Sequence, residues 1–323
     1  MVNKTKLSEA EVGANVSGWV YLQRSKTSIA KNGTPFIGWE GLDAAGQRLY
    51  GTYFAKGRNE VLPQYAKGSV LQVTGVIGAG EQGSSVWAQS ISLVDDPEGV
   101  REFKVVCFPA VPKEELDGYI SALQTYANSI TNIKLLTLSQ KMFEFMLPYL
   151  PMCPAGKSVH EPVRGGLAKH TYEVVSLVDS QILLKNKGLN RDVLIFSALY
   201  HDIGKTQEYT EDLAYSPNGR LISHSSLAIQ IITSIIIQHQ IAVDPDLLRQ
   251  VKHCLLSHHG EFSEIKPATK EALALCYADI MMAKIGNIEE MVRSNKIGQD
   301  GWGTQSFALG LAPYVPELDD RIK

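Results

Sequence analysis

The feature that most constrains the fold is a change in hydrophobic period about a third of the way along the chain. Up to residue 94, short runs that alternate apolar and polar residues are separated by Gly, Asn and Asp, which is typical of β-strands. From residue 113 onward, apolar residues recur at helical spacing. With 323 residues the chain is long enough for two domains. We therefore expect an α+β multidomain protein, with a β-domain first and an α-domain second.

The order of the expected elements indicates which fold the β-domain adopts. Strands are expected near residues 15–23, 34–42, 47–54, 69–78 and 85–94, with a short helical or irregular crossover between the third and fourth. That order is typical of the five-stranded oligonucleotide/oligosaccharide-binding (OB) barrel. We expect an OB domain over residues 1–96. A linker is expected over 97–112, where Pro97, Pro109 and Pro112 interrupt the pattern.

Helices are expected near residues 113–127, 134–149, 166–186, 191–203, 222–240, 245–258 and 268–286. They predict an all-α helical bundle over 113–293, followed by an extended tail over 294–323 that is rich in Gly and Pro. Residues 225–243 contain no Lys, Arg, Asp or Glu, but Gln, Ser, Thr and His interrupt the apolar run. A buried helix is therefore expected there, and no membrane span.

Composition excludes several classes of protein. The chain is 44% hydrophobic and 20% charged with a net charge of −3, which excludes a disordered or strongly basic chain. The first twenty residues lack the apolar core of a secretory signal, so a cytoplasmic location is expected. The four cysteines are scattered without a CxxC pair, which argues against disulfides and a thiolate zinc site.

The histidines carry the strongest chemical signal. Five of the eight histidines form an ordered series with two acids, each on or beside an expected helix: His170, His201, Asp202, His224, His258, His259 and Asp279. A helical bundle that points imidazoles and carboxylates inward builds a metal site, and this donor set suits Mn, Fe, Co, Ni or Zn. A buried Asp279 would also be costly without a metal or cationic partner. The alternative is a set of separate core histidines.

The motifs around this series resemble those of the HD-domain metal-dependent phosphohydrolases. The relevant stretches are Pro154–His160, Gly165–His170, His201–Lys205, Leu256–Glu261 and Ala278-Asp279, continuing to Phe307-Ala308-Leu309. Within that superfamily the chain is similar to the YhaM-type 3′→5′ exoribonucleases, which join an N-terminal OB domain to a C-terminal HD domain. The likeness covers nearly the whole chain. One departure is Glu161, which stands where the family commonly has a second histidine.

The resemblance implies two divalent cations per chain bridged by Asp202, with Mn²⁺ expected first and Fe, Co, Ni or Zn as alternatives. It assigns His170, His201, Asp202 and Asp279 to one cation, and Asp202, His224 and His258 to the other. His259 is either a further ligand or an outer partner. Two cations sharing a carboxylate lower the pKa of water, which yields a hydroxide able to attack phosphorus. Lys205, Lys157 and His160 are expected to act beside Asp202 on the phosphate.

An OB barrel is expected to contact nucleic acid, because exposed aromatic residues on OB strands stack bases while Lys and Arg contact phosphates. The expected strands carry Trp19, Tyr21, Phe36, Trp39, Tyr53 and Trp87, and the first strand and turn carry Arg24, Lys26 and Lys31. We take Trp19, Tyr21, Phe36 and Trp39, with the three basic residues, as candidate nucleic-acid contacts. Alternation along strands turns about half of such residues outward, without indicating which half.

The leading hypothesis is a divalent-metal-dependent 3′→5′ exonuclease that hydrolyses single-stranded RNA, with DNA left open as a substrate. One alternative is a phosphodiesterase of cyclic dinucleotides or small nucleotides, which has no evident need for an OB domain. Another is a single-stranded nucleic-acid-binding module with an inactive HD domain, against which the intact ligand series argues. A homo-oligomer is also left open.

Overall fold

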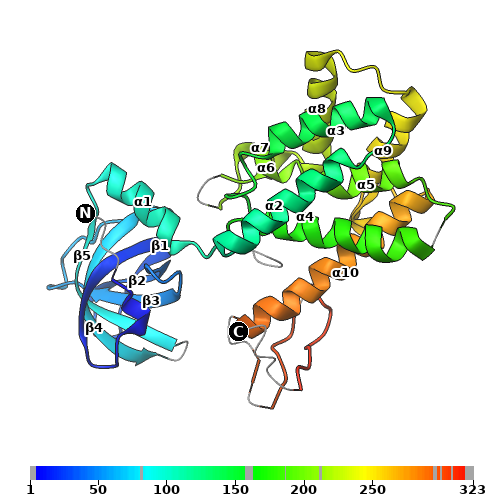
Figure 1. Cartoon of the computed structure of the whole chain (residues 1–323). Helices are drawn as coiled ribbons and strands as arrows, with labels where there is room; N and C mark the ends of the chain where they lie inside the picture. Colours follow the sequence, from blue (N-terminus) through cyan, green and yellow to red (C-terminus); the bar gives the residue numbers. More distant parts are fainter. Residues whose placement is uncertain are drawn as a thin grey trace. The chain divides into compact units, whose positions relative to one another are not determined.

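The structure is a computed structural model that describes residues 5–80, 83–156, 163–185, 187–210, 213–293, 297–298, 300–306 and 308–316. The chain divides into two compact units, Met1–Pro109 and Ala110–Lys323. The first contains the strands and the second contains most of the helices (Figure 1). Each unit is described by itself.

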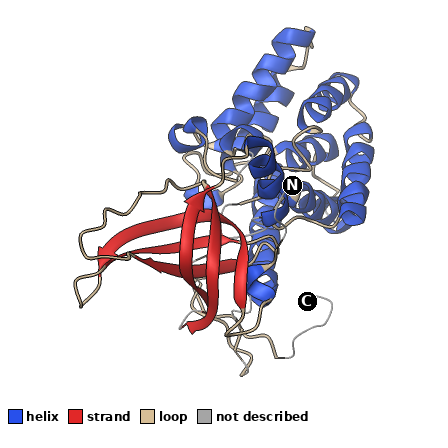
Figure 2. Cartoon of the chain, turned by 90° about the vertical axis from the view of Figure 1, so that its left-hand side faces the viewer, coloured by secondary structure: helices blue, strands red, loops and turns tan. Residues whose placement is uncertain are grey.

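The first unit is a five-stranded closed barrel. Its strands are β1 (Asn15–Ile29), β2 (Pro35–Leu42), β3 (Arg48–Phe54), β4 (Val70–Gly80) and β5 (Gly83–Leu93), in the order β1-β2-β3-β5-β4. β1 also pairs with β4 and closes the barrel; β3 and β5 pair in parallel, and the other described strand pairs are antiparallel. The strands of the barrel are drawn in red in Figure 2. The crossover between β3 and β4 is irregular. This order is that of the OB barrel, so the predicted fold is confirmed.

Alternation along the strands fills the barrel interior with aliphatic side chains. Fully buried members are Val20, Leu22, Leu49, Leu71, Val73 and Val86, joined by Leu7 of the short 3₁₀-helix η1 (Leu7–Glu9). Trp39 lies in the same core. A Cβ at Gly51 would overlap the Trp39 ring, so the glycine makes room for the indole.

The expected linker over 97–112 is wrong for residues 97–107, which form helix α1 (Pro97–Cys107). The Asp96 side chain caps this helix by accepting a hydrogen bond from Gly99 N, and Pro97 occupies its first turn, where the missing N–H costs nothing. Phe103 packs edge-on against Trp19 of β1, with ring centroids 5.6 Å apart. Pro97, one of the prolines that suggest a linker, therefore marks a helix start, and α1 belongs to the first unit.

The second unit is helical. Its longer helices are α2 (Lys113–Asn128), α3 (Ile133–Met146), α4 (Gly166–Leu177), α5 (Arg191–Tyr200), α8 (His224–His239), α9 (Pro245–Ser257) and α10 (Lys270–Arg293). A π-helical turn, η2 (Val178–Leu183), continues α4. All seven expected helices are present. The short elements α6 (Lys205–Glu208), α7 (Pro217–Leu221) and η3 (Gly260–Phe262) were not expected, because elements of three to five residues are too short to show a hydrophobic period.

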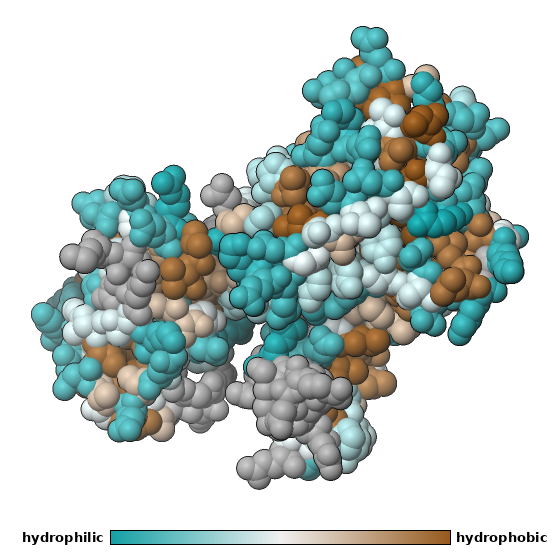
Figure 3. All heavy atoms as spheres, in the orientation of Figure 1, coloured by the Kyte–Doolittle hydropathy of each residue, from teal (hydrophilic) through white to brown (hydrophobic). Residues whose placement is uncertain are grey.

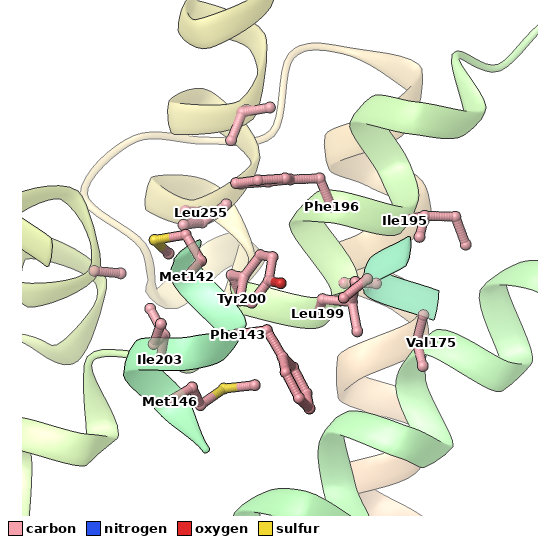
Figure 4. Close-up of a cluster of buried hydrophobic side chains, with 14 of the residues drawn as sticks. Met142, Phe143, Met146, Val175, Ile195, Phe196, Leu199, Tyr200, Ile203 and Leu255 are labelled. Atoms are coloured by element: carbon pink, nitrogen blue, oxygen red, sulfur yellow. The ribbon is translucent and has the colours of Figure 1, made fainter. Parts of the chain in front are cut away.

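Helix α5 is the centre of the helical unit. Every residue from Asp192 to Tyr200 is buried, so the helix is surrounded on all sides. Figure 4 shows Tyr200 among the side chains of Met142, Phe143 and Leu199. The Tyr200 hydroxyl donates a hydrogen bond of 2.6 Å to the Ser139 carbonyl oxygen. Because α5 is fixed along its length, the residues that follow Tyr200 emerge at a defined place inside the bundle.

After α10, the described part of the tail has isolated bridges instead of regular strands, pairing Ile297 with Gly303, Trp302 with Tyr314 and Ser306 with Leu311. Among the described residues, none of the helices has the length and apolar character that a transmembrane span requires. The face drawn in Figure 3 mixes hydrophilic residues with smaller apolar patches.

Candidate metal centre and nucleic-acid face

The helical unit gathers all seven residues of the predicted ligand series. His170 lies on α4, His201 and Asp202 follow α5, His224 begins α8, His258 and His259 follow α9, and Asp279 lies on α10. Their ligand atoms form two groups, each lying within 4.8 Å of one another: His170, His201 and Asp279, and Asp202, His224, His258 and His259. Side chains separated by more than a hundred residues are thereby brought to one place.

The first group, His170, His201 and Asp279, is buried. His170 Nε2 lies 3.0 Å from Asp279 Oδ1 and 3.4 Å from His201 Nε2. The second group includes the partly exposed His224, whose Nε2 lies 3.3 Å from His259 Nε2. Imidazole nitrogens at such distances are close enough together to be able to ligate a common cation.

Asp202 lies between the two groups. Its Oδ2 atom lies 3.3 Å from His201 Nε2 and 3.7 Å from His170 Nε2. Its Oδ1 atom lies 3.5 Å from His224 Nε2 and 3.7 Å from His258 Nε2. One carboxylate oxygen thus faces each group, which is the arrangement that a bridging ligand requires. Gly204 contributes to it, since a Cβ there would overlap the backbone carbonyl of His224.

Unsatisfied atoms at the centre of the site fit a divalent cation. Asp202 Oδ1 and His258 Nε2 are buried and have no hydrogen-bond partner among the described residues. Leaving such atoms unpaired is costly, and a cation between them would satisfy both. The donor set of imidazoles and carboxylates suits a transition metal.

The electrostatics of the acids favour the same reading. Burial opposes the charged forms of Asp202 and Asp279, yet neighbouring charges outweigh it. The Lys205 ammonium and His201 hold the pKa of Asp202 well below its ordinary value. Contact with His170 and the charge of His201 lower the pKa of Asp279. Both carboxylates are therefore ionised near neutral pH, as metal ligands must be.

The pKa values of three imidazoles at the site shift in different directions. Burial and the neighbouring His259 lower the pKa of His258 well below its ordinary value. Burial and His224 lower the pKa of His259 to about 4. His201 behaves in the opposite way, because Asp202 outweighs the effect of burial and raises its pKa. His258 and His259 consequently release their protons more readily than His201.

Lys205 is buried, and its Nζ donates a hydrogen bond of 2.6 Å to Asp202 Oδ2. Burial opposes its charge, but Asp202 raises its pKa, so the side chain is an ammonium at the metal centre. Lys157 and His160 lie outside the described residues, as does Glu161.

Three of the candidate nucleic-acid contacts are wrong because the structure buries them. Trp19 is 8% exposed and Tyr21 is 3% exposed. Both lie under α1 and the residue after it, where Tyr21 packs against Phe108 with ring centroids 4.9 Å apart. Trp39 is 4% exposed and faces the barrel core. A ring without exposed faces cannot stack a base.

Phe36 belongs instead to a row of aromatic rings on the outside of the barrel. Phe36 on β2 pairs with Phe54 on β3, and their ring centroids are 5.5 Å apart. Phe54 is nearly parallel to Trp87 of β5, with centroids 6.4 Å apart and planes 8° apart. Phe54 is 40% exposed and Trp87 is 54% exposed. These three residues, Phe36, Phe54 and Trp87, are called the aromatic row below.

One of the predicted basic residues, Lys26, lies on the same face as this row. In the β1–β2 register, Ser28 pairs with Phe36 and Lys26 with Gly38, so alternation places Lys26 on the same face as Phe36. Lys26 and Lys31 are exposed. Arg24 is exposed as well, but its guanidinium lies 3.5 Å from Glu40 Oε2.

Sequence reasoning missed two functional candidates, Phe54 and Glu208. Phe54 could have been found from the pairing of the second and third strands, which sets it opposite Phe36. Glu208 follows Lys205 by three residues, is buried, and lies with its Oε2 3.1 Å from His224 Nδ1. Little in the sequence signals this contact, because it joins the end of the short helix α6 to the start of α8 across a loop.

Comparisons with known proteins agree with this geometry. Residues 167–283 match the family model of the HD domain. The chain is 27% identical over 304 residues to the 3′-5′ exoribonuclease YhaM of Bacillus licheniformis, covering 93% of this chain and 94% of the relative. It is 26% identical over 306 residues to the 3′-5′ exoribonuclease YhaM of Bacillus subtilis, with the same coverage of 93% and 94%. The predicted resemblance is confirmed.

A solved structure similar to the chain is the second OB-fold domain of replication protein A from Methanococcus maripaludis. It is 16% identical, covers 28% of this chain and 95% of that chain, and has a TM-score of 0.24. The assignment of the barrel rests on its own strand order.

Proposed function

We propose that this chain is a divalent-metal-dependent exonuclease that hydrolyses single-stranded RNA from the 3′ end and releases nucleotides. The observation that carries the proposal is Asp202, whose two oxygens face two separate groups of imidazoles. The 3′ polarity and the RNA substrate are supported by the names of relatives that align over 93% of the chain.

The residues that would hold the cations are the two groups whose ligand atoms lie close together. His170, His201 and Asp279 would hold one, the partly exposed group of His224, His258 and His259 would hold the other, and Asp202 would bridge them. Bound divalent cations activate a water and offset charge on the phosphoryl oxygens. Mn²⁺ is the metal we propose, with Fe, Co, Ni or Zn as alternatives.

Lys205 and Asp202 then have distinct roles. Asp202 would hold the two groups of imidazoles at a fixed separation. Its Oδ2 atom also orients the Lys205 ammonium by accepting a hydrogen bond of 2.6 Å from Nζ. That ammonium lies close enough to the site to contact a non-bridging phosphate oxygen and stabilise its charge. Lys157 and His160 stay predictions for the same role.

The barrel would retain the strand. Parallel exposed rings stack bases without regard to their sequence, and neighbouring lysines contact phosphates, which together suit a single strand. The aromatic row with Lys26 has these properties. It also argues against a small-nucleotide phosphodiesterase, and the complete ligand series argues against an inactive HD domain. A cytoplasmic location and an oligomeric state stay predictions.

The test is to add Mn²⁺ to metal-free protein in the presence of each of four substrates. Two are 5′-labelled linear strands, one of RNA and one of DNA, and the others are a circular single-stranded RNA and a cyclic dinucleotide. The expected result is a ladder of shortened linear RNA, with circular RNA left intact. Rapid cutting of the circle would contradict the exonuclease. Hydrolysis of the cyclic dinucleotide alone would favour the alternative enzyme.

A further inference from the structure

The histidines of the metal centre differ in how their second ring nitrogen is held. His201 Nδ1–H donates a hydrogen bond of 2.9 Å to Ala198 O, and His258 Nδ1–H donates one of 2.7 Å to Leu255 O. Each acceptor is the carbonyl three residues earlier, at the end of the helix that the histidine follows. These bonds fix the tautomer that leaves Nε2 free to bind a cation.

His224 has no such carbonyl within its own helix, because it is the first residue of α8. A side chain from another element approaches its Nδ1 instead, that of Glu208 at the end of α6. Glu208 Oε2 lies 3.1 Å from His224 Nδ1. Oε2 is buried and has no hydrogen-bond partner among the described residues, so at this distance it is available to accept the Nδ1–H of His224. Glu208 is therefore placed to do for His224 what backbone carbonyls do for His201 and His258.

The backbone around Glu208 is held firmly enough for this role. Its carbonyl accepts a hydrogen bond of 2.9 Å from Ser216 N, and Ser216 Oγ donates one of 2.7 Å to Gln207 O. The next residue, Tyr209, forms a bridge with Tyr215 and stacks on its ring, with centroids 5.3 Å apart. A Cβ at Gly219 would overlap the Glu208 carbonyl, so the loop packs directly against it.

We propose that Glu208 is a positioning residue whose carboxylate accepts the Nδ1–H of His224, selecting the tautomer that presents Nε2 to the second cation. The first group, His170, His201 and Asp279, receives no contact from Glu208 at hydrogen-bond distance in the described structure. A substitution at Glu208 should therefore affect one cation and spare the other. This inference rests on the divalent-metal centre proposed above.

The test is calorimetric titration of metal-free full-length protein with Mn²⁺, without RNA. In Glu208→Ala, the affinity of one binding step should fall by about 10- to 100-fold, the usual loss for an outer partner of a ligand, while the other changes by less than about 3-fold. Glu208→Gln keeps a carbonyl oxygen that can accept the Nδ1–H, so its loss should be smaller. Glu144→Gln is the matched control, because Glu144 forms only an exposed pair with Lys141.

A second measurement reports the tautomer directly. In the metal-free protein labelled with ¹⁵N-histidine, the His224 signals, assigned by their absence in His224→Gln, should show Nδ1–H in the wild type and in Glu208→Gln. In Glu208→Ala they should shift toward the other tautomer. This readout does not move if Glu208 merely supports the fold.

Several results would overturn the inference. Unchanged Mn²⁺ binding in both Glu208 variants would do so, as would equal weakening of both steps together with a lower melting temperature. If Glu208→Ala does not fold, the isosteric Glu208→Gln decides the question. Failure of the wild type to bind Mn²⁺ would instead count against the proposed function.

Discussion

The barrel and the helical unit present their functional side chains in opposite ways. On the barrel, Phe54 and Trp87 are 40% and 54% exposed and are set by strand register alone. In the helical unit, His170, His201 and His258 are fully buried and come from three different segments. An exposed aromatic residue can be replaced without disturbing the hydrophobic core, whereas a buried ligand residue is itself part of a core. The two regions should therefore be separable by substitution, and the loss in each should be of a different kind.

The largest expected effect separates hydrolysis from strand binding. Asp202→Asn keeps the size of the side chain but removes the charge that both groups share, so both cations should be lost. RNA hydrolysis should fall by more than about 100-fold, the upper loss for an outer partner, since a bridging ligand contributes more. The affinity for a long single strand, measured by fluorescence anisotropy, should stay near the wild-type value.

The control for this prediction is metal content by mass spectrometry. A variant that retains both cations and full hydrolysis would rule out Asp202 as the bridge. A variant that loses strand binding as well would show that the barrel depends on the metal centre.

The reverse separation comes from the aromatic row. Phe54→Ala and Trp87→Ala each remove a stacking surface worth about 1–3 kcal/mol per base, so each should weaken long-strand binding by about 5- to 150-fold. Hydrolysis of a dinucleotide, which needs little help from the barrel, should change far less. Phe262→Ala is the matched control, because Phe262 is an aromatic residue 94% exposed on the helical unit. Equal losses in Phe262→Ala and Phe54→Ala would remove the special role of the row.

The same contrast explains what the sequence could predict. His201, Asp202 and Asp279 stand out because imidazoles and ionised acids are uncommon inside apolar helices, so their chemistry is legible before their positions are known. Trp19 and Trp39 are ordinary members of strands. Their burial depends on a covering helix, α1, and on the side of the barrel that each strand turns inward. Glu208 depends on a loop contact. The side of the barrel on which a side chain lies, and its contacts with residues distant in the sequence, are properties of the tertiary structure. The local sequence pattern does not encode them.

A third prediction uses pH, because all eight histidines lie outside the barrel. A lowered pKa keeps an imidazole neutral into acid, while a raised pKa makes a proton compete with the cation at higher pH. His259, with its pKa lowered to about 4, and His258, with its pKa held well below the ordinary value, should stay neutral, whereas His201, with its raised pKa, should protonate first. Between about pH 7 and pH 5, spanning the ordinary imidazole pKa of about 6.5, one cation should be lost before the other.

The measurement is Mn²⁺ occupancy and strand affinity across that range on the same samples. Hydrolysis should decline with the first cation while strand binding by the barrel changes little. Simultaneous loss of both cations would contradict the difference in pKa between His201 and the pair His258 and His259.

The smallest expected effect concerns stability and is confined to the helical unit. Asp192 on α5 accepts hydrogen bonds of 3.1 Å from Thr131 N and 2.7 Å from Asn132 N. Burial opposes its charge, but these bonds lower its pKa. A lowered pKa means that the folded state favours the carboxylate, so this stabilisation is present above the ordinary pKa of about 3.9 and is lost as pH falls through the folded value.

Asp192→Asn should reduce the free energy of unfolding by about 1–3 kcal/mol near neutral pH. In calorimetric scans the helical transition should shift down at neutral pH and converge with the wild type in acid, while a barrel transition should not move. A shift that persists unchanged at the lowest pH would mean that packing, and not the carboxylate, stabilises this end of α5.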